Sequence, residues 1–245
     1  MNIVWSVFLG VVQGVTEFLP VSSSGHLVIV QYFIPGFEQP GVFFDVVLHL
    51  ATTFAVLYFF RKRIFSLSKK YLSLLVVGTI PAGIVGFMFQ TQLEKMFGDL
   101  NWVGIELVIT GILNLLIDKV ETRNKSLSVS DSFLIGISQA IAIIPGISRS
   151  GATIFSAVKL GIDRKKAAEF SFLLSIPAIL GANVLQLLTH GLDGSIEPSI
   201  YLAGFLAAFV SGFLSIRIVF KTLSERHFSL FGLYCIGLGA LIFIL

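Results

Sequence analysis

The chain has 245 residues, of which 55% are hydrophobic and 13% charged, and its mean hydropathy is +0.92. Soluble domains contain roughly 45–50% apolar and about 25% charged residues, so this composition excludes a soluble globular protein and indicates an integral membrane protein. The net charge is +3, and the cations are not interleaved with aromatic residues as on a nucleic-acid surface. The bilayer is therefore an expected partner and nucleic acid is not.

Residues 1–34 are apolar but too short for two full membrane crossings, and the sequence PVSSSG interrupts them at residues 20–25. Because proline and glycine end a helix and serine can cap the next one, we expect a helix–turn–helix hairpin here. The same reasoning applies to residues 131–160, which the sequence PGISRSG interrupts at residues 145–151. Irregular backbone at membrane depth is tolerated only where protein or a water-filled cavity surrounds it. Both turns should therefore lie inside the protein, in re-entrant hairpins that return to the side from which they enter.

Three apolar stretches separate the two hairpins, and three more follow the second one. They cover residues 43–60, 71–89 and 102–118, and then 167–189, 199–216 and 228–245. Each is long enough to cross a bilayer as a helix, which takes about 17 to 25 residues. The sequence therefore predicts an all-α polytopic membrane protein with six transmembrane helices and two re-entrant helix–turn–helix hairpins.

One polar cluster occurs twice, with corresponding residues 126 positions apart. Its members are Gly10, Gln13, Ser22, Ser24 and Gly25 in the first copy and Gly136, Gln139, Ser148, Ser150 and Gly151 in the second. Each copy contains one hairpin and three spans, and this odd number of crossings inverts the second copy. We expect a single membrane domain, residues 1–245, made of two inverted repeats of about 1–120 and 127–245. The two turns should meet near the middle, as in inverted-repeat transporters.

Fifteen of the 17 lysines and arginines fall on one side of this topology. They are Arg61, Lys62, Arg63, Lys69, Lys70, Lys119, Arg123, Lys125, Lys159, Arg164, Lys165, Lys166, Arg217, Lys221 and Arg226. Lys95 lies on the other side, and Arg149 lies in the second turn. Since cytoplasmic loops of membrane proteins carry an excess of lysine and arginine, we expect both termini on the extracytoplasmic side. The site between the turns should open mainly to that side as well.

The first turn carries the residues of a general base and a nucleophile. An ionised carboxylate that faces lipid costs about 2.5–3.5 kcal/mol on insertion scales, so Glu17 needs a polar partner or a cavity. A merely structural role, pinning the hairpin, is the alternative for it. Ser23 and His26 together fit chemistry at phosphorus, in which a base or a histidine nucleophile acts. Their spacing does not decide which of the two attacks.

Arg149 in the second turn needs an anion for its fork of donors, from a ligand or from the protein. Glu17 is one candidate, and the resulting ion pair would be structural. Helices that start at Ser22–Ser24 and at Ser148–Ser150 would direct backbone N–H groups and positive dipole ends to the same point, which suits a phosphate. The other polar residues of the spans are expected to bond neighbouring helices. They are Asp45, His49, Glu106, Asn114, Asn183 and Gln186.

The sequences QGVTEFLPVSSSGH at residues 13–26 and PGISRSGAT at residues 145–153 resemble the two signatures of the bacterial undecaprenyl-diphosphate phosphatase family, also called the bacitracin-resistance proteins. The resemblance covers essentially the whole chain. It implies an enzyme of the bacterial plasma membrane that hydrolyses undecaprenyl diphosphate to undecaprenyl phosphate and inorganic phosphate. This reaction recycles the carrier lipid for cell-wall synthesis and confers bacitracin resistance. The alternative of another class is an inverted-repeat secondary transporter or lipid flippase.

The resemblance also implies roles for individual residues. The catalytic positions would be Glu17, Ser23, His26 and Arg149, and the residues at the phosphate would be Gln13, Ser22, Ser24, Ser148, Ser150 and Thr153. Many members of the family have glutamate where this chain has Gln13, so Glu17 alone would bind any metal ion. A requirement for Mg²⁺ or Ca²⁺ stays open at this point, as do the prenyl chain length and the oligomeric state, a homodimer included.

Overall fold

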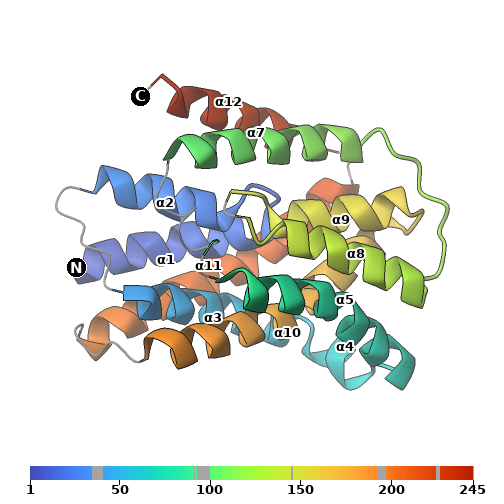
Figure 1. Ribbon diagram of the computed structural model, residues 1–245, viewed down its shortest axis with the longest axis horizontal. Helices are drawn as coiled ribbons and strands as arrows, with labels where there is room; N and C mark the ends of the chain where they lie inside the picture. The colour runs from blue at the N-terminus through green and yellow to red at the C-terminus, as the bar shows by residue number, and fades with distance from the viewer. Residues whose placement is uncertain are drawn as a thin grey trace.

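The structure is a computed structural model, and it describes residues 1–34, 41–90, 92, 100–144, 146–191, 197–224 and 227–244. Regular secondary structure in these residues is entirely helical (Figure 1). The helices are α1 (Ile3–Phe18), α2 (Ser23–Phe33), α3 (Gly41–Phe59), α4 (Arg61–Phe65), α5 (Lys69–Met88), α7 (Leu100–Ile117), α8 (Val129–Ile141), α9 (Arg149–Lys159), α10 (Arg164–His190), α11 (Pro198–Ser224) and α12 (Phe228–Ile242).

Four helices in the described part of the chain, α5, α7, α10 and α11, are long and apolar enough to cross a membrane. The apolar helices α1, α8 and α12 are shorter, as is the Phe43–Phe59 part of α3. Large apolar side chains cover the outside, for example Ile84 on α5 and Val210 on α11. The prediction of an all-helical, multi-pass membrane protein is confirmed. The finer count of six spans and two re-entrant hairpins stays a prediction, because α12 has only 15 residues.

The helices lie where the apolar stretches predict them, with two differences. Helix α11 continues to Ser224, beyond the predicted end at residue 216, and the short helix α4 was not predicted. The length of an apolar stretch reflects the thickness of the membrane. A helix can continue beyond that stretch as long as its backbone hydrogen bonds and side chains allow. In α11 the Arg217 guanidinium lies 4.8 Å from the ring centroid of Phe213, so the polar extension packs on the apolar part.

Two hairpins, α1–α2 and α8–α9, enter the molecule from opposite ends, and their turns meet in the middle (Figure 1). Each second helix is capped by the serine before it. Ser22 Oγ accepts a hydrogen bond from the Gly25 N–H at 3.2 Å, and Ser148 Oγ accepts one from the Gly151 N–H at 3.1 Å. Corresponding residues of the two copies of the motif therefore make the same local contact.

Glycines bring helices of the two halves into backbone contact. A Cβ atom on Gly10 of α1 would collide with the Gly204 carbonyl oxygen of α11, and one on Gly136 of α8 would collide with the backbone of Gly78 of α5. The two contacts correspond to each other in the repeat. Gly136 lies 126 positions after Gly10, and Gly204 lies 126 positions after Gly78. Each contact also joins a helix of one half to a helix of the other. At Gly83 of α5, by contrast, a Cβ would meet no described atom within 4 Å.

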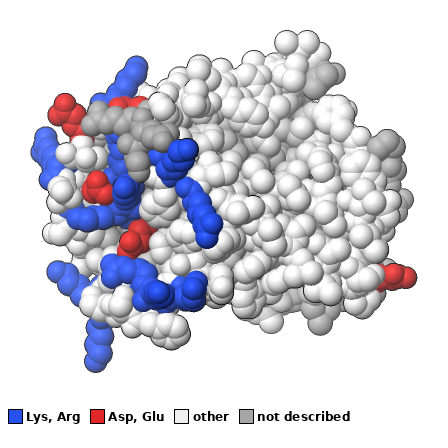
Figure 2. Space-filling model, turned by 180° about the vertical axis from the view of Figure 1, so that it is seen from behind, with Lys and Arg blue, Asp and Glu red and all other residues white. Residues whose placement is uncertain are grey.

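Cations collect at one end of the molecule. Figure 2 shows the blue side chains together at that end of the face that it presents, while the rest of this face is almost uncharged. It is the end that carries α4 in Figure 1, and both termini lie at the opposite end. Salt bridges Arg63–Glu169 and Lys125–Asp131, both 2.7 Å, lie in the cationic region. Two of the cations that were assigned to a side of the predicted topology, Lys95 and Arg226, lie outside the described residues.

Candidate active site

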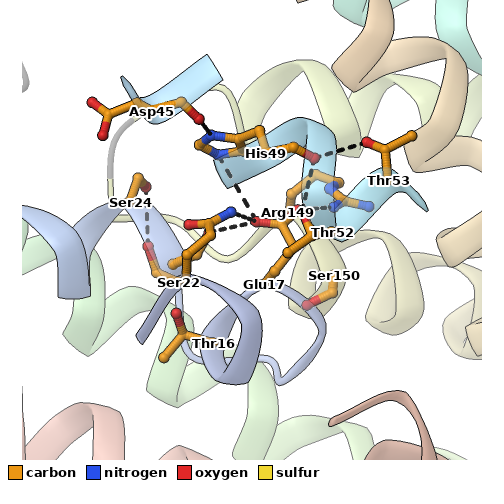
Figure 3. Close-up of polar contacts among 12 residues, drawn as sticks. Thr16, Glu17, Ser22, Ser24, Asp45, His49, Thr52, Thr53, Arg149 and Ser150 are labelled. Atoms are coloured by element: carbon orange, nitrogen blue, oxygen red, sulfur yellow. Dashed lines mark hydrogen bonds and ion pairs between the residues drawn. The ribbon is translucent and has the colours of Figure 1, made fainter. Parts of the chain in front are cut away.

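The carboxylate of Glu17 lies where the two hairpins meet (Figure 3). It is buried in the last turn of α1, with 5% of its side chain exposed. Its Oε1 accepts a 2.5 Å hydrogen bond from Arg149 Nη2. Its Oε2 accepts bonds from Ser23 Oγ at 2.7 Å and from Gln13 Nε2 at 3.0 Å. The structure thus places three of the predicted site residues, Gln13, Ser23 and Arg149, around the buried carboxylate of a fourth, Glu17.

Arg149 uses only part of its guanidinium in this contact. It is the first residue of α9, and 16% of its side chain is exposed. Nη2 bonds Glu17, whereas Nη1 is buried and has no hydrogen-bond partner within the described part of the chain. A buried donor without a partner is costly, so it is often a place where a ligand binds.

One serine of each turn bonds a backbone group of the other turn. The Gly146 N–H donates to Ser24 Oγ at 3.4 Å, and Ser150 Oγ donates to the Leu19 carbonyl at 3.2 Å. Within each turn the two serine hydroxyls also pair, Ser22 with Ser24 at 3.3 Å and Ser148 with Ser150 at 3.2 Å. The hydroxyls predicted to line a phosphate therefore also hold the turns together.

Thr153 lies deeper in α9, one turn beyond the hydroxyls of the second turn. Its Oγ1 bonds the Arg149 carbonyl at 2.8 Å and the Ser171 hydroxyl of α10 at 2.6 Å. Its hydroxyl therefore fixes the start of α9 against α10. The structure places it behind Arg149, as a support for that residue.

His26 is engaged elsewhere. Its Nδ1 donates to the Ser22 carbonyl at 2.7 Å, and its Nε2 lies 2.7 Å from the Tyr234 hydroxyl of α12, with the two rings stacked. No hydrogen bond or ion pair joins His26 to Glu17 or Arg149 among the described residues. Both ring nitrogens of His26 thus have partners other than Glu17 and Arg149, and its catalytic role stays a prediction.

A different histidine borders the site. His49 of α3 places Nε2 4.0 Å from Glu17 Oε2, while its Nδ1 donates to the Asp45 carbonyl at 2.8 Å (Figure 3). His49 therefore contacts a neighbouring helix, as expected for the polar residues of the spans, but the residue that it contacts belongs to the candidate site. The one-turn spacing of Asp45 and His49 shows that they share a helix face, but it carries no information on which helix they face.

A polar stripe on α7 holds both turns. It consists of Glu106, Thr110 and Asn114, each one helical turn from the next and each buried. Asn114 Nδ2 donates to the Pro20 carbonyl of the first turn at 2.5 Å. Thr110 Oγ1 donates to the Gly146 carbonyl at 3.1 Å and accepts from the Ser148 N–H at 2.9 Å. The stripe therefore satisfies backbone groups that irregular turns leave without partners.

This stripe differs from our expectation that polar residues of the spans bond neighbouring helices. The expectation holds for Asn183 of α10, whose Nδ2 donates to the Val46 carbonyl of α3 at 3.4 Å. It does not hold for Asn114, which bonds a turn. Glu106 packs against Gly146, where a Cβ would lie 2.5 Å from its Oε2, and this oxygen has no partner among the described atoms. Gly146, at φ +89°, leaves room for that carboxyl group.

The family model of the bacitracin resistance protein BacA matches residues 6–241. The chain belongs to this family. It is 39% identical to the undecaprenyl-diphosphatase of Syntrophotalea carbinolica and 41% identical to that of Christiangramia forsetii, in each case over 99% of this chain and 98% of the relative. It is 40% identical to the undecaprenyl-diphosphatase of Methanococcus vannielii, over 94% of this chain and 95% of the relative.

In this member of the BacA family the site has the parts of an activated nucleophile. A serine hydroxyl donates to a carboxylate, and an amide and a guanidinium hold that carboxylate in place. The described residues contain no group of three or more His, Cys, Asp and Glu side chains that could hold a metal ion. Glu17, the residue expected to bind any cation, has both oxygens hydrogen-bonded to other side chains.

Proposed function

We propose that this chain hydrolyses undecaprenyl diphosphate to undecaprenyl phosphate and inorganic phosphate, and so recycles the carrier lipid for cell-wall synthesis. The observation that carries the proposal is the Glu17 carboxylate, which accepts hydrogen bonds from the Ser23 hydroxyl and the Arg149 guanidinium. The names of the relatives support the same reaction. None of these three relatives is named as a transporter or a flippase.

Arg149 binds the terminal phosphate in this proposal. Its Nη1 is buried and has no hydrogen-bond partner among the described residues, so it can donate to a phosphate oxygen while Nη2 keeps its bond to Glu17. The first turn of α9 adds the positive end of the helix dipole. Charge that develops on the phosphoryl oxygens meets donors that are already in position.

Ser23 is our proposed nucleophile, with Glu17 as its base. Ser23 Oγ lies 2.7 Å from Glu17 Oε2, whereas both ring nitrogens of His26 already bond other groups. The serine oxygen forms a bond to the terminal phosphorus, its proton goes to Glu17, and the anhydride bond breaks to release undecaprenyl phosphate. Glu17 then gives this proton to the leaving undecaprenyl phosphate. Water attacks the phosphoserine, Glu17 takes a proton from the water and returns it to Ser23 Oγ as the serine–phosphorus bond breaks, and inorganic phosphate leaves.

The proposal includes the topology of six spans and two re-entrant hairpins in an inverted repeat. The opposite entry of the hairpins and the glycine contacts offset by 126 positions support it. The cationic end would face the cytoplasm, and the termini at the other end would lie outside. The diphosphate would then reach Arg149 mainly from the extracytoplasmic side.

The test is to trap the covalent intermediate. Purified protein is mixed with undecaprenyl diphosphate labelled in its terminal phosphate, quenched, digested and mapped. We expect label on the peptide that contains Ser23, stable in acid as a phosphoserine is. Ser23→Ala should abolish both the label and phosphate release, while Ser66→Ala, at an exposed serine outside the membrane helices, should change neither. Acid-labile label on His26, or full activity of Ser23→Ala, would contradict the assignment.

A further inference from the structure

An apolar groove of about 660 Å³ runs between α5 and α8. Helix α5 contributes Ile80 and Ile84, Phe89 directly follows this helix, and α8 contributes Phe133, Ile137 and Ile141. Among the described residues that line it, Gln92 alone has a polar side chain. Its volume lies within the roughly 300–1,000 Å³ that are typical of sites for small molecules.

The groove begins where the two helices touch. At Gly78 and Gly136 the backbones are in contact, because a Cβ on Gly136 would meet the Gly78 Cα atom at 3.1 Å. Farther along α5 this contact ends. A Cβ on Gly83 would meet no described atom within 4 Å, and one on Gly86 would meet only Ile143 Cδ1, at 3.8 Å. Beyond the contact, Ile80 and Ile84 of α5 and Ile137 and Ile141 of α8 line the groove.

The other end of the groove lies beside the active site. Ile144 lines it, and this residue is two positions before Gly146. The Gly146 N–H donates to Ser24 Oγ and its carbonyl accepts from Thr110 Oγ1, so this end of the groove adjoins the contact between the turns. Arg149 follows three residues later. A molecule with its phosphate at Arg149 and an apolar chain attached can therefore lay that chain along α8.

We propose that this groove binds the first isoprene units of the polyprenyl chain while the diphosphate is held at Arg149. The inference rests on the proposed function, and it names the part of the protein that recognises the lipid. A methyl-branched hydrocarbon is the chemistry that fits a concave wall of isoleucine and phenylalanine without a charge. The chain leaves the groove near Gly78 and continues into the bilayer.

The first experiment fills the groove far from the phosphate. Ile137→Trp lines the groove, and Leu134→Trp, on the same helix but outside the lining, is the matched control. Phosphate release is measured with undecaprenyl diphosphate and with dimethylallyl diphosphate, whose chain is a single isoprene unit. Because an apolar site discriminates by roughly 10-fold or more for one misplaced methylene group, we expect Ile137→Trp to raise KM for the long substrate by roughly 10-fold. Its KM for dimethylallyl diphosphate should change much less, because a single unit occupies only the end of the groove at Ile144, and Leu134→Trp should change neither.

The second experiment does not depend on the fold of a filled variant. A photoreactive phenylalanine analogue is placed at Ile141 or, as control, at Leu134, and the protein is irradiated with radiolabelled undecaprenyl diphosphate. Cross-linking at residue 141 well above that at 134 supports the inference. Equal cross-linking at both positions, or an unchanged ratio of the two KM values in Ile137→Trp, would show that ordinary bilayer lipid fills the groove and would overturn it. A wild-type protein that releases phosphate from neither substrate would instead refute the proposed function.

Discussion

Arg149 Nη2 donates a 2.5 Å hydrogen bond to Glu17 Oε1, although 132 positions separate the two residues in the chain. The bond joins the last turn of α1 to the first turn of α9, and thus one hairpin to the other. Removal of one partner from a buried ion pair typically costs about 3–5 kcal/mol, because the other charge is left without compensation. The pair therefore supports both the fold and the chemistry that we propose.

Loss of the Arg149 guanidinium should lower the rate of catalysis, whereas loss of an arginine outside the site should not. Removal of a donor that stabilises a transition state typically lowers the rate by roughly 100- to 1000-fold, and we expect this loss in phosphate release for Arg149→Ala. Arg149→Lys should restore little, because an ammonium group lacks the planar fork. Arg217→Ala, which removes an arginine that packs over Phe213, is the control and should keep its activity. Parent activity in folded Arg149→Ala would refute its role.

Glu17 and Arg149 should behave as one unit in kinetics. Groups that act together show effects that do not add, so Glu17→Gln in the Arg149→Ala background should cost far less than it costs alone. The measurement is kcat/KM for both single variants and the double variant, with thermal stability recorded for each. Losses that simply multiply would show that the two side chains act independently.

The polar stripe on α7 should affect activity because Thr110 holds the second turn in place. Thr110→Val keeps the shape of the side chain and removes its bonds to the Gly146 carbonyl and the Ser148 N–H. Each hydrogen bond contributes about 0.5–1.5 kcal/mol, so we expect kcat to fall by roughly 10-fold and thermal stability to decrease. Thr79→Val is the control, because within the described part of the chain that hydroxyl bonds the Leu75 carbonyl of its own helix and no other residue. Equal effects of the two substitutions would argue against a positioning role of Thr110.

The helix contacts at glycine can be tested by stability alone. Gly10→Ala places a Cβ against the Gly204 carbonyl, and overpacking of this kind typically costs about 1–3 kcal/mol. Gly83→Ala is the matched control, since its Cβ would meet no described atom within 4 Å and alanine favours a helix over glycine by roughly 1 kcal/mol. Thermal unfolding in detergent should rank Gly83→Ala at or above the parent and Gly10→Ala below it. The reverse order would contradict the packing of α1 on α11.

Local patterns in the chain were sufficient to locate the helices and both turns. An apolar stretch long enough for a bilayer marks a helix, and a proline with glycine and serine inside such a stretch marks a turn. The need of Glu17 and Arg149 for polar partners also followed from the sequence, because a charge in hydrocarbon is costly whatever the fold is. The sequence therefore predicted that both residues have polar partners inside the membrane, with Glu17 as one candidate partner of Arg149.

Other members of the site depended on which helices pack together. The periodicity of α3, α7 and α12 shows the face on which His49, Thr110 and Tyr234 lie, but not the helix or turn opposite that face. His49 borders Glu17, Thr110 bonds the second turn, and the Tyr234 hydroxyl hydrogen-bonds the Nε2 atom of His26. The amino-acid sequence by itself determined the membrane class, the two turns and the charges that must pair. Only the tertiary structure decided the neighbours of those charges, because contacts between distant segments depend on the packing of helices against each other, which no local pattern encodes.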